Sequence, residues 1–134
     1  MKYLLDTNTC IRHLNRRSES IILKLGSLAP NQIAVCSVVK AELLYGGHRS
    51  NQPERTLARQ RLFFDRFVSL PFDDQAAEVY GVIRAQLAAS GTPIGPNDLM
   101  IAAIALANDL TLVTNNRREF SRVEGLQIDD WEED

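Results

Sequence analysis

The chain has 134 residues, of which 45% are hydrophobic and 24% are charged, and its formal net charge is −2. These totals predict one globular domain over residues 1–134, and no apolar run approaches the roughly 20 residues of a membrane-spanning helix. The N-terminal segment turns acidic at Asp6 and is too short for a secretion signal, so we expect a cytoplasmic protein with no membrane contact.

The charge is unevenly distributed along the chain. Residues 129–134 contain five acids, and the remainder has 15 basic and 12 acidic residues, with many arginines in clusters. The planar guanidinium of arginine suits phosphate, so the distribution permits RNA binding, although solvated helix faces are the simpler explanation of any one cluster. The acidic tail around Trp131 is either a surface strand end or a partner contact.

In the first half of the chain, short apolar runs alternate with helical patterns. In chain order we predict a strand over 3–5, a helix from Thr7 or Asn8 to about Asn15, a helix over 19–28 and a strand over 33–36. Ser37 is expected to cap a helix that Gly46 and Gly47 end, and an arginine-rich helix follows over 54–67.

The second half continues the alternation. We predict a strand over 68–70, a helix from Asp73 or Asp74 to about Ala89, and a helix over 99–107 capped by Asn97 or Asp98. They are followed by a strand over 110–113, a short helix opened by Asn116 and Glu119, and an edge strand over 126–128. The helix over 99–107 is apolar on all sides and should be buried. The alternation predicts an α/β/α sandwich whose central, mostly parallel sheet has four or five strands.

The cysteines offer no metal site. Cys10 and Cys36, together with His13 and His48, have no zinc-binding spacing, so we interpret both cysteines as small buried apolar residues. Any metal in this chain is therefore expected to be held by oxygen ligands.

Polar residues follow two of the predicted strands. Asp6 follows the first strand, and Asn115 and Asn116 follow the fourth. Ligands of parallel sheets bind beyond the carboxyl ends of the strands, so this edge is where we expect a site. A helix cap is the alternative role for Asp6.

Two further acids lie on predicted helices. Glu42 shares one helical face with Val38, Ala41 and Tyr45, about 200° from Lys40, which predicts that Glu42 points inward. An inward glutamate must be paired, hydrogen-bonded or bound to a metal, so a structural ion pair is its alternative role. Asp98 begins the buried helix, where a cap would also explain it. Together these acids suggest a site for Mg²⁺ or Mn²⁺, which prefer oxygen ligands and can promote phosphodiester hydrolysis.

Four segments in order resemble the motifs of PIN-domain nucleases, over the whole chain. They are Tyr3-Leu4-Leu5-Asp6-Thr7-Asn8, Ser37 to Leu43 with Glu42, Pro93 to Asp98 followed by Ile101-Ala102-Ala103, and Leu112 to Asn116 with Glu119-Phe120. Within these nucleases, the chain specifically resembles the VapC toxins of bacterial VapBC toxin–antitoxin modules. It implies a metal-dependent endoribonuclease acting on structured RNA such as tRNA, a homodimer, and a VapB-type antitoxin that covers the active site in a higher assembly.

The same resemblance assigns roles to individual residues. It implies Asp6, Glu42 and Asp98 as catalytic acids and metal ligands, with Mg²⁺ or Mn²⁺ as the cofactor. The fourth family position is often an aspartate and aligns here with Asn116, which removes one charge but could still supply a ligand oxygen or position a water. Thr7 and Thr114 are expected to donate hydrogen bonds behind the ligands, a helix cap and a strand end being their alternative roles.

Two other functions compete with this interpretation. Haloacid-dehalogenase-like phosphatases also place an aspartate after the first strand, but they need a second one two residues on, where this chain has Asn8. An RNA-binding PIN domain with a degenerate site is the non-enzymatic alternative, and Asn116 favours it. No glycine-rich nucleotide motif is present, so use of NAD or ATP is not expected.

Overall fold

The computed structural model describes residues 1–132 and has a five-stranded sheet in the order β3-β2-β1-β4-β5. Every neighbouring pair of strands is parallel. The strands are β1 (Tyr3–Leu5), β2 (Ile33–Cys36), β3 (Val68–Leu70), β4 (Thr111–Val113) and β5 (Ile128–Asp129). The predicted fold class is confirmed, and the sheet is wholly rather than mostly parallel.

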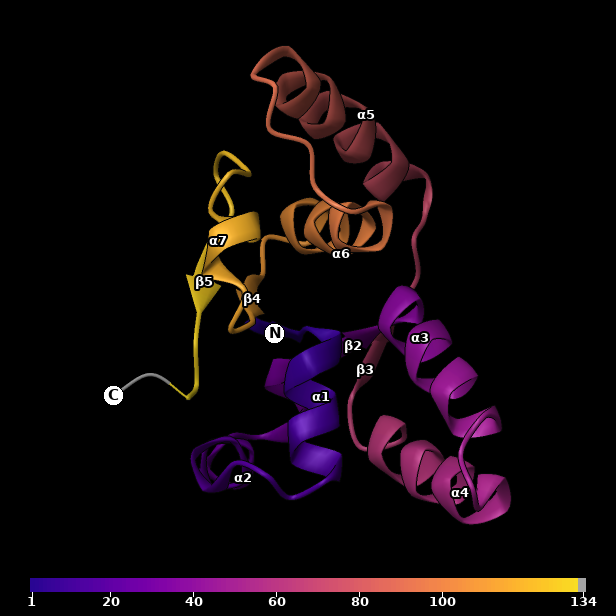
Figure 1. Ribbon diagram of the computed structural model, residues 1–134. Coiled ribbons are helices and arrows are strands. Elements are labelled where there is room, and N and C mark those ends of the chain that lie inside the picture. Colours follow the sequence, from indigo (N-terminus) through magenta and orange to yellow (C-terminus); the bar gives the residue numbers. More distant parts are fainter. Residues whose placement is uncertain (133–134) are drawn as a thin grey trace.

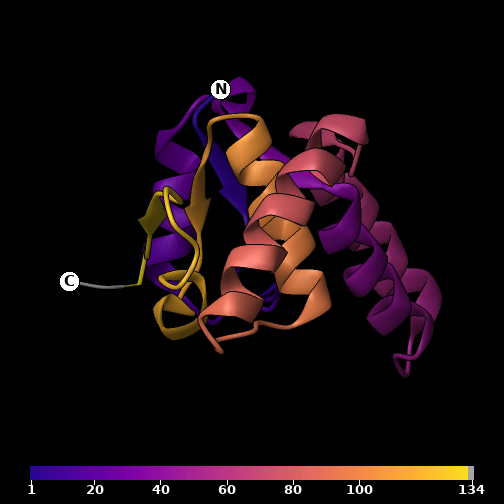
Figure 2. The ribbon, with the colours of Figure 1, turned by 90° about the horizontal axis from the view of Figure 1, so that it is seen from above.

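Helices cover both faces of this sheet (Figure 1). α1 and α2 lie on one side and α5 and α6 on the other, while α3 and α4 form a pair beside the sheet, as Figure 2 also shows from above. The helices are α1 (Thr7–Leu14), α2 (Glu19–Ser27), α3 (Ser37–His48), α4 (Pro53–Phe64), α5 (Asp74–Ala89), α6 (Pro96–Ala107) and α7 (Arg117–Phe120), with a 3₁₀ turn η1 (Pro30–Gln32). Within residues 1–132, no helix combines the length and the apolarity that crossing a bilayer requires.

The core lies where the sheet meets α6. The middle of that helix, residues 101–105, is wholly buried, as its apolar sequence predicted. Leu4 and Leu112 from the two central strands are also inaccessible to solvent. Cys10 and Cys36 are buried free thiols in the same core, so their interpretation as small apolar residues is confirmed.

Several predicted helix ends are wrong. α3 does not stop at its glycines but continues to His48, because neither Gly46 nor Gly47 adopts the positive φ that ends a helix. Gly47 instead lies close to α4, where a methyl group would meet Leu57 and Gln60 at 2.8 Å. Ser37 is the first residue of α3 rather than its cap.

The caps of α1 and α6 also differ from the prediction. Asp6 rather than Thr7 or Asn8 is the N-cap of α1. Gly95 is the N-cap of α6, so Asp98 lies within its first turn.

The C-terminal segment packs on the chain itself. Trp131 is buried, its ring meets that of Tyr3 edge-on at 5.3 Å, and Glu132 forms an ion pair with Arg12 at 2.7 Å. The tail up to Glu132 is therefore held by the fold rather than being a free surface end. Glu133 and Asp134 lie outside the described residues.

Candidate metal-dependent active site

The sheet order reverses at β1, because β2 and β3 follow on one side and β4 and β5 lie on the other. Such a reversal opens a crevice at the carboxyl ends of the two central strands. Asp6 directly follows β1 and Thr114 directly follows β4, so the fold brings together residues that are 108 positions apart.

Asp6 is held in this crevice by two hydrogen bonds. Its Oδ1 accepts from the backbone N–H of Thr7 at 2.7 Å, and its Oδ2 accepts from the hydroxyl of Thr114 at 2.7 Å. The side chain is only 4% exposed, and this burial raises the pKa of the Asp6 carboxyl despite both hydrogen bonds. The charges of Glu42 and Glu119 raise it further. Asp6 is therefore both the cap of α1 and an acid of the crevice.

Glu42 reaches the same place from α3. The hydroxyl of Thr7 donates to Glu42 Oε1 at 2.9 Å. The prediction that its helical face points into the core is wrong, because the buried face of α3 consists of Val39, Leu43 and Gly47. Glu42 is half-buried and Tyr45 is exposed, so this face borders the crevice and solvent.

Lys40 does not extend into open solvent as expected. Its ammonium lies 5.4 Å from the centre of the Phe64 ring and donates to the Ser69 hydroxyl at 2.8 Å. Lys40 therefore contacts Phe64 and Ser69 rather than Glu42.

Asp98 approaches from the first turn of α6. Partial burial, followed by the charges of Asp6, Glu119 and Glu42, raises the pKa of Asp98 to about 7. A hydrogen bond to Glu119 raises it as well, which places the shared proton on Asp98. Asp98 therefore lies within electrostatic reach of Asp6, Glu42 and Glu119.

Asn116 and Glu119 form the predicted capping pair of α7. Asn116 Oδ1 accepts from the Glu119 N–H at 3.3 Å, and Asn116 Nδ2 donates to Glu119 Oε2 at 3.1 Å. Glu119 Oε1 accepts from the Gly95 N–H at 2.7 Å, and this bond is the main reason that the pKa of Glu119 is lowered. Both polar atoms of the Asn116 side chain therefore contact Glu119.

Glu119 is the site residue that sequence reasoning missed as an acid. Its position three residues after Asn116 indicated only a capping role, although it lies in the fourth PIN-like segment. In the fold it contributes a fourth carboxylate where Asn116 brings no charge. We call Asp6, Glu42, Asp98 and Glu119 the carboxylate cluster.

The donors of this cluster fit a hard divalent cation. They are all oxygens, and mutual repulsion of carboxylates is the electrostatic state that a bound cation relieves. Within residues 1–132, no three His, Cys, Asp or Glu side chains already converge as a ready metal-binding group. The threonine hydroxyls and the Gly95 N–H instead hold the individual carboxylates, which are electrostatically coupled to one another.

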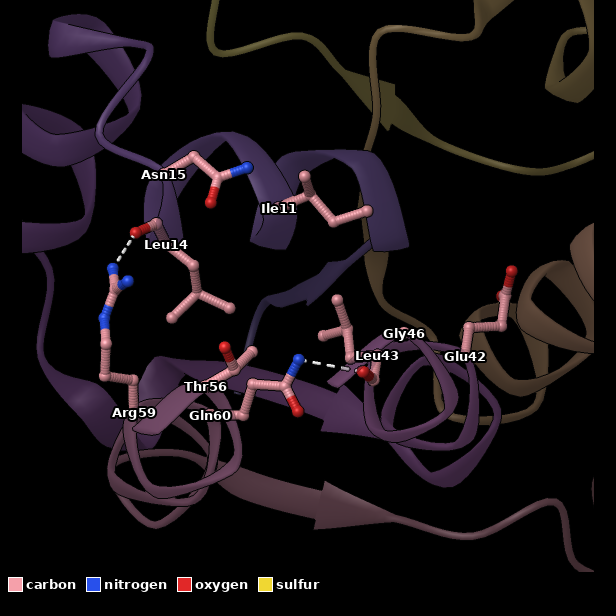
Figure 3. A pocket seen from close by; sticks show the side chains of 9 residues that line it. All are labelled: Ile11, Leu14, Asn15, Glu42, Leu43, Gly46, Thr56, Arg59 and Gln60. Carbon is pink, nitrogen blue, oxygen red and sulfur yellow. Dashed lines mark hydrogen bonds between the residues drawn. The ribbon is translucent and has the colours of Figure 1, made fainter. Parts of the chain in front are cut away.

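Glu42 also lies at the border of two cavities. One, of about 180 Å³, lies between α1, α3 and α4 and is drawn in Figure 3. Figure 3 shows Glu42 at one end and Arg59 at the other, where the guanidinium donates to the carbonyl of Leu14. The second, of about 430 Å³, lies between α3 and α6.

Comparison with known proteins agrees with this architecture. Residues 3–126 match the PIN domain family. The chain is 44% identical over 131 residues to the tRNA(fMet)-specific endonuclease VapC of Salmonella typhimurium, covering 98% of each chain. It is 39% identical over 133 residues to Ribonuclease VapC2 of Rickettsia felis, covering 98% of this chain and 99% of the relative.

Solved structures give the same result. The crystal structure of DNA-bound VapBC from Salmonella typhimurium matches with a TM-score of 0.93 and 44% identity, covering 98% of both chains. VapBC2 from Rickettsia felis, bound to a DNA fragment from its promoter, matches with a TM-score of 0.92 and 39% identity, covering 98% of this chain and 99% of that one. The chain therefore belongs to the PIN-domain family, within its VapC ribonucleases.

Proposed function

We propose that this protein is the toxin of a type II toxin–antitoxin module and a Mg²⁺- or Mn²⁺-dependent endoribonuclease that hydrolyses structured RNA, with tRNA as its substrate class. The observation that carries the proposal is a network of hydrogen bonds at the carboxyl edge of the sheet, in which Thr7 contacts both Asp6 and Glu42, and the Thr114 hydroxyl contacts Asp6. The backbone N–H of Asn116 donates to the same Thr114 hydroxyl, and the Asn116 side chain contacts Glu119. Acids gathered in this way destabilise a fold unless a proton or a cation compensates them.

Asp6, Asp98 and Glu42 would hold the ion, and Glu119 adds a fourth carboxylate. Both cysteines are buried with a raised pKa, so only oxygen donors remain, which suits Mg²⁺ or Mn²⁺. When bound, such an ion lowers the pKa of the attacking water and stabilises the leaving oxygen of the phosphodiester.

The polar neighbours of the cluster hold the acids in fixed orientations. The Thr114 hydroxyl fixes Asp6, and the Thr7 hydroxyl fixes Glu42. Asn116 fixes Glu119 through two hydrogen bonds, so we assign Asn116 to positioning rather than to ligation. Hydrogen bonds behind metal ligands typically change metal affinity or activity by about 10- to 100-fold when they are removed.

Basic side chains around the C-terminal ends of α1 and α4 support RNA as the substrate. Arg16, Arg59 and Arg66 line a cavity of about 210 Å³ together with His13. Arg59 also borders the Figure 3 cavity, whose other end is Glu42. We propose that these cationic groups contact phosphates of an RNA that extends from the carboxylate cluster. The name of the Salmonella relative supports tRNA as the substrate class.

We further propose a VapB-type antitoxin as partner and a homodimer that joins it in a higher assembly. The Salmonella and Rickettsia relatives are described as VapBC, which supports the pairing. The Figure 3 cavity carries apolar surface from Ile11, Leu14 and Leu43 beside Glu42. An antitoxin segment lying there would cover the active site.

The test is RNA cleavage by the purified chain. We expect a tRNA transcript to be cut with Mg²⁺ or Mn²⁺, to stay intact with chelator, and to stay intact with Asp98→Asn. Glu124→Gln is the matched control, because Glu124 is exposed and outside the carboxylate cluster. Cleavage that persists in chelator or in Asp98→Asn would refute the proposal.

The same experiment separates the alternatives. RNA binding without cleavage under any metal would support the degenerate PIN domain, although Glu119 weakens the argument that Asn116 gave for it. The phosphatase alternative has lost its basis, because the chain belongs to the PIN-domain family.

A further inference from the structure

The cavity between α3 and α6 connects the two carboxylate-bearing helices. Its α3 wall includes Glu42, and its α6 wall includes Asn97, the residue before Asp98. At about 430 Å³, it lies within the range of about 300–1,000 Å³ that small-molecule sites occupy. The lining residues are Ser37, Val38, Ala41, Glu42, Tyr45, Asn97 and Met100.

Tyr45 is the aromatic residue of this wall, one helical turn after Glu42. It is 64% exposed, which is unusual for a ring that could pack against the core. The Arg49 guanidinium lies 5.5 Å from its ring centre and donates to its hydroxyl at 3.0 Å. Arg49 therefore orients the Tyr45 ring, which stays largely exposed.

Tyr80 and Arg84 form the same kind of tyrosine–arginine pair in a structural role. Arg84 lies 5.8 Å from the ring centre of Tyr80 and donates to its hydroxyl at 3.0 Å, the same arrangement on α5. The Tyr80 ring also packs edge-on against Phe72 at 5.8 Å. Among the ring contacts described for residues 1–132, Tyr45 has no aromatic partner of this kind.

We infer that the cavity between α3 and α6 is a nucleobase-binding site, in which Tyr45 stacks on the base of a nucleotide next to the scissile phosphate. An oriented aromatic ring with an open face is the usual platform for an unpaired base, and a neighbouring arginine adds a cation–π contribution. Asn97 supplies amide groups that can hydrogen-bond to a base edge, and Met100 supplies apolar contact.

Because of the position of the cavity, a base bound there would belong to a nucleotide next to the scissile phosphate. Glu42 belongs both to the cavity wall and to the carboxylate cluster, so a phosphate at the cluster leaves the attached nucleoside beside α3 and α6. This inference rests on the proposed ribonuclease function, and it adds a residue that holds the nucleotide next to the cut, so that Asn97 can hydrogen-bond to its base edge.

Three variants test it. Tyr45→Leu removes the ring, Tyr45→Phe keeps the ring and removes the hydroxyl, and Tyr80→Leu is the matched control for losing an arginine-paired tyrosine elsewhere. Binding is measured with Asp6→Asn as the background, by quenching of a short RNA that carries fluorescent aminopurine at each position in turn. Cleavage is measured separately with tRNA transcripts in which the bases flanking the cut are exchanged.

We expect Tyr45→Leu to weaken RNA binding about 5- to 150-fold, because base–aromatic stacking contributes about 1–3 kcal/mol per base and about 1.4 kcal/mol corresponds to tenfold. Quenching at one aminopurine position should disappear, and discrimination between flanking bases should shrink. Tyr45→Phe should keep most of the quenching, and Tyr80→Leu should bind as the parent does.

Equal binding, equal quenching and equal base preference in Tyr45→Leu and the parent would overturn the inference. A change of oligomeric mass in Tyr45→Leu without a change in RNA binding would also overturn it, because Tyr45 would then serve an interface between copies. Failure of the parent chain to cleave any RNA would refute the proposed function instead, and the quenching measurement would still decide whether Tyr45 stacks on a base.

Discussion

Thr114→Val should destabilise the metal-free protein in a pH-dependent way. Thr114 is 1% exposed, donates to Asp6 Oδ2 at 2.7 Å, and accepts from the Asn116 N–H at 3.0 Å. Valine has nearly the same shape but forms neither hydrogen bond. The substitution therefore removes one of the two hydrogen bonds described for the Asp6 carboxylate and unpairs the Asn116 N–H.

The expected cost follows from these two losses. A hydrogen bond to a charged group contributes about 1.5–3 kcal/mol, and an unpaired buried donor costs about 1–3 kcal/mol. The Asn116 N–H is only partly buried, so the lower end of the second range applies. We expect the free energy of unfolding to fall by about 2–4 kcal/mol at pH 8.

The pH dependence follows from the pKa of Asp6. Burial already raises that pKa, and the Thr114 hydroxyl lowers it, so Thr114→Val raises it further above the unfolded value. An acid whose pKa is raised by folding loses stability as the pH rises through the interval between the unfolded and folded values. The variant should therefore lose more stability relative to the parent at pH 8 than at pH 4, which lies near the ordinary pKa of an aspartate and leaves less of the Asp6 carboxyl ionised.

Denaturant unfolding in the presence of chelator measures this difference, and Thr9→Val is its control. Thr9 is 5% exposed, and its hydroxyl donates at 3.1 Å to the neutral carbonyl of Val113, which also accepts from the Asp6 N–H. Its loss should cost about 0.5–1.5 kcal/mol at either pH. If both variants lost equal stability at pH 4 and pH 8, the reasoning about the Asp6 carboxylate would be refuted.

Three further predictions concern the cluster and the helix pair. Without metal, Asp98→Asn should be more stable than the parent by about 1–2 kcal/mol at pH 8 but not at pH 4, because only the ionised Asp98 carboxylate destabilises the fold. A pKa of about 7 corresponds to a larger effect, which solvent screening reduces for a half-exposed group, and thermal unfolding at both pH values measures the difference. Glu119→Gln keeps the capping hydrogen bond to Asn116 Oδ1 but replaces one acceptor oxygen by an N–H donor, so it should lower the rate of RNA cleavage about 10- to 100-fold and lower the melting temperature only moderately; equal rates would remove Glu119 from the site. Gly47→Ala should destabilise by about 1–2 kcal/mol because its methyl group meets α4 at 2.8 Å, whereas Gly46→Ala, with no atom within 4 Å, should stabilise by about 0.5–1 kcal/mol; denaturant unfolding of the pair decides.

Elements with an unambiguous apolar period can be predicted from the sequence alone. The runs at 3–5 and 33–36 form β1 and β2 in the interior of the sheet, and the helix over 99–107 is buried, as its all-round apolarity predicts. The acids Asp6, Glu42 and Asp98 can be identified from the sequence alone, because their places after a strand or on a helix and their resemblance to PIN motifs point to one edge. Helix ends are less predictable, since a glycine ends a helix only when it adopts a positive φ, and Gly47 instead packs against α4.

The assembly of the candidate site depends on contacts between residues that are far apart in the sequence. The Thr114 hydroxyl holds Asp6 across 108 residues, and the Gly95 N–H holds Glu119 across 24, contacts that no local pattern contains. The charge of Glu119 belongs with those of the other three acids because the fold brings Glu119 beside Asp98. The physical reason is that periodicity reports which face of an element is apolar, whereas electrostatic coupling between carboxylates depends on distances that only the packed sheet and helices set.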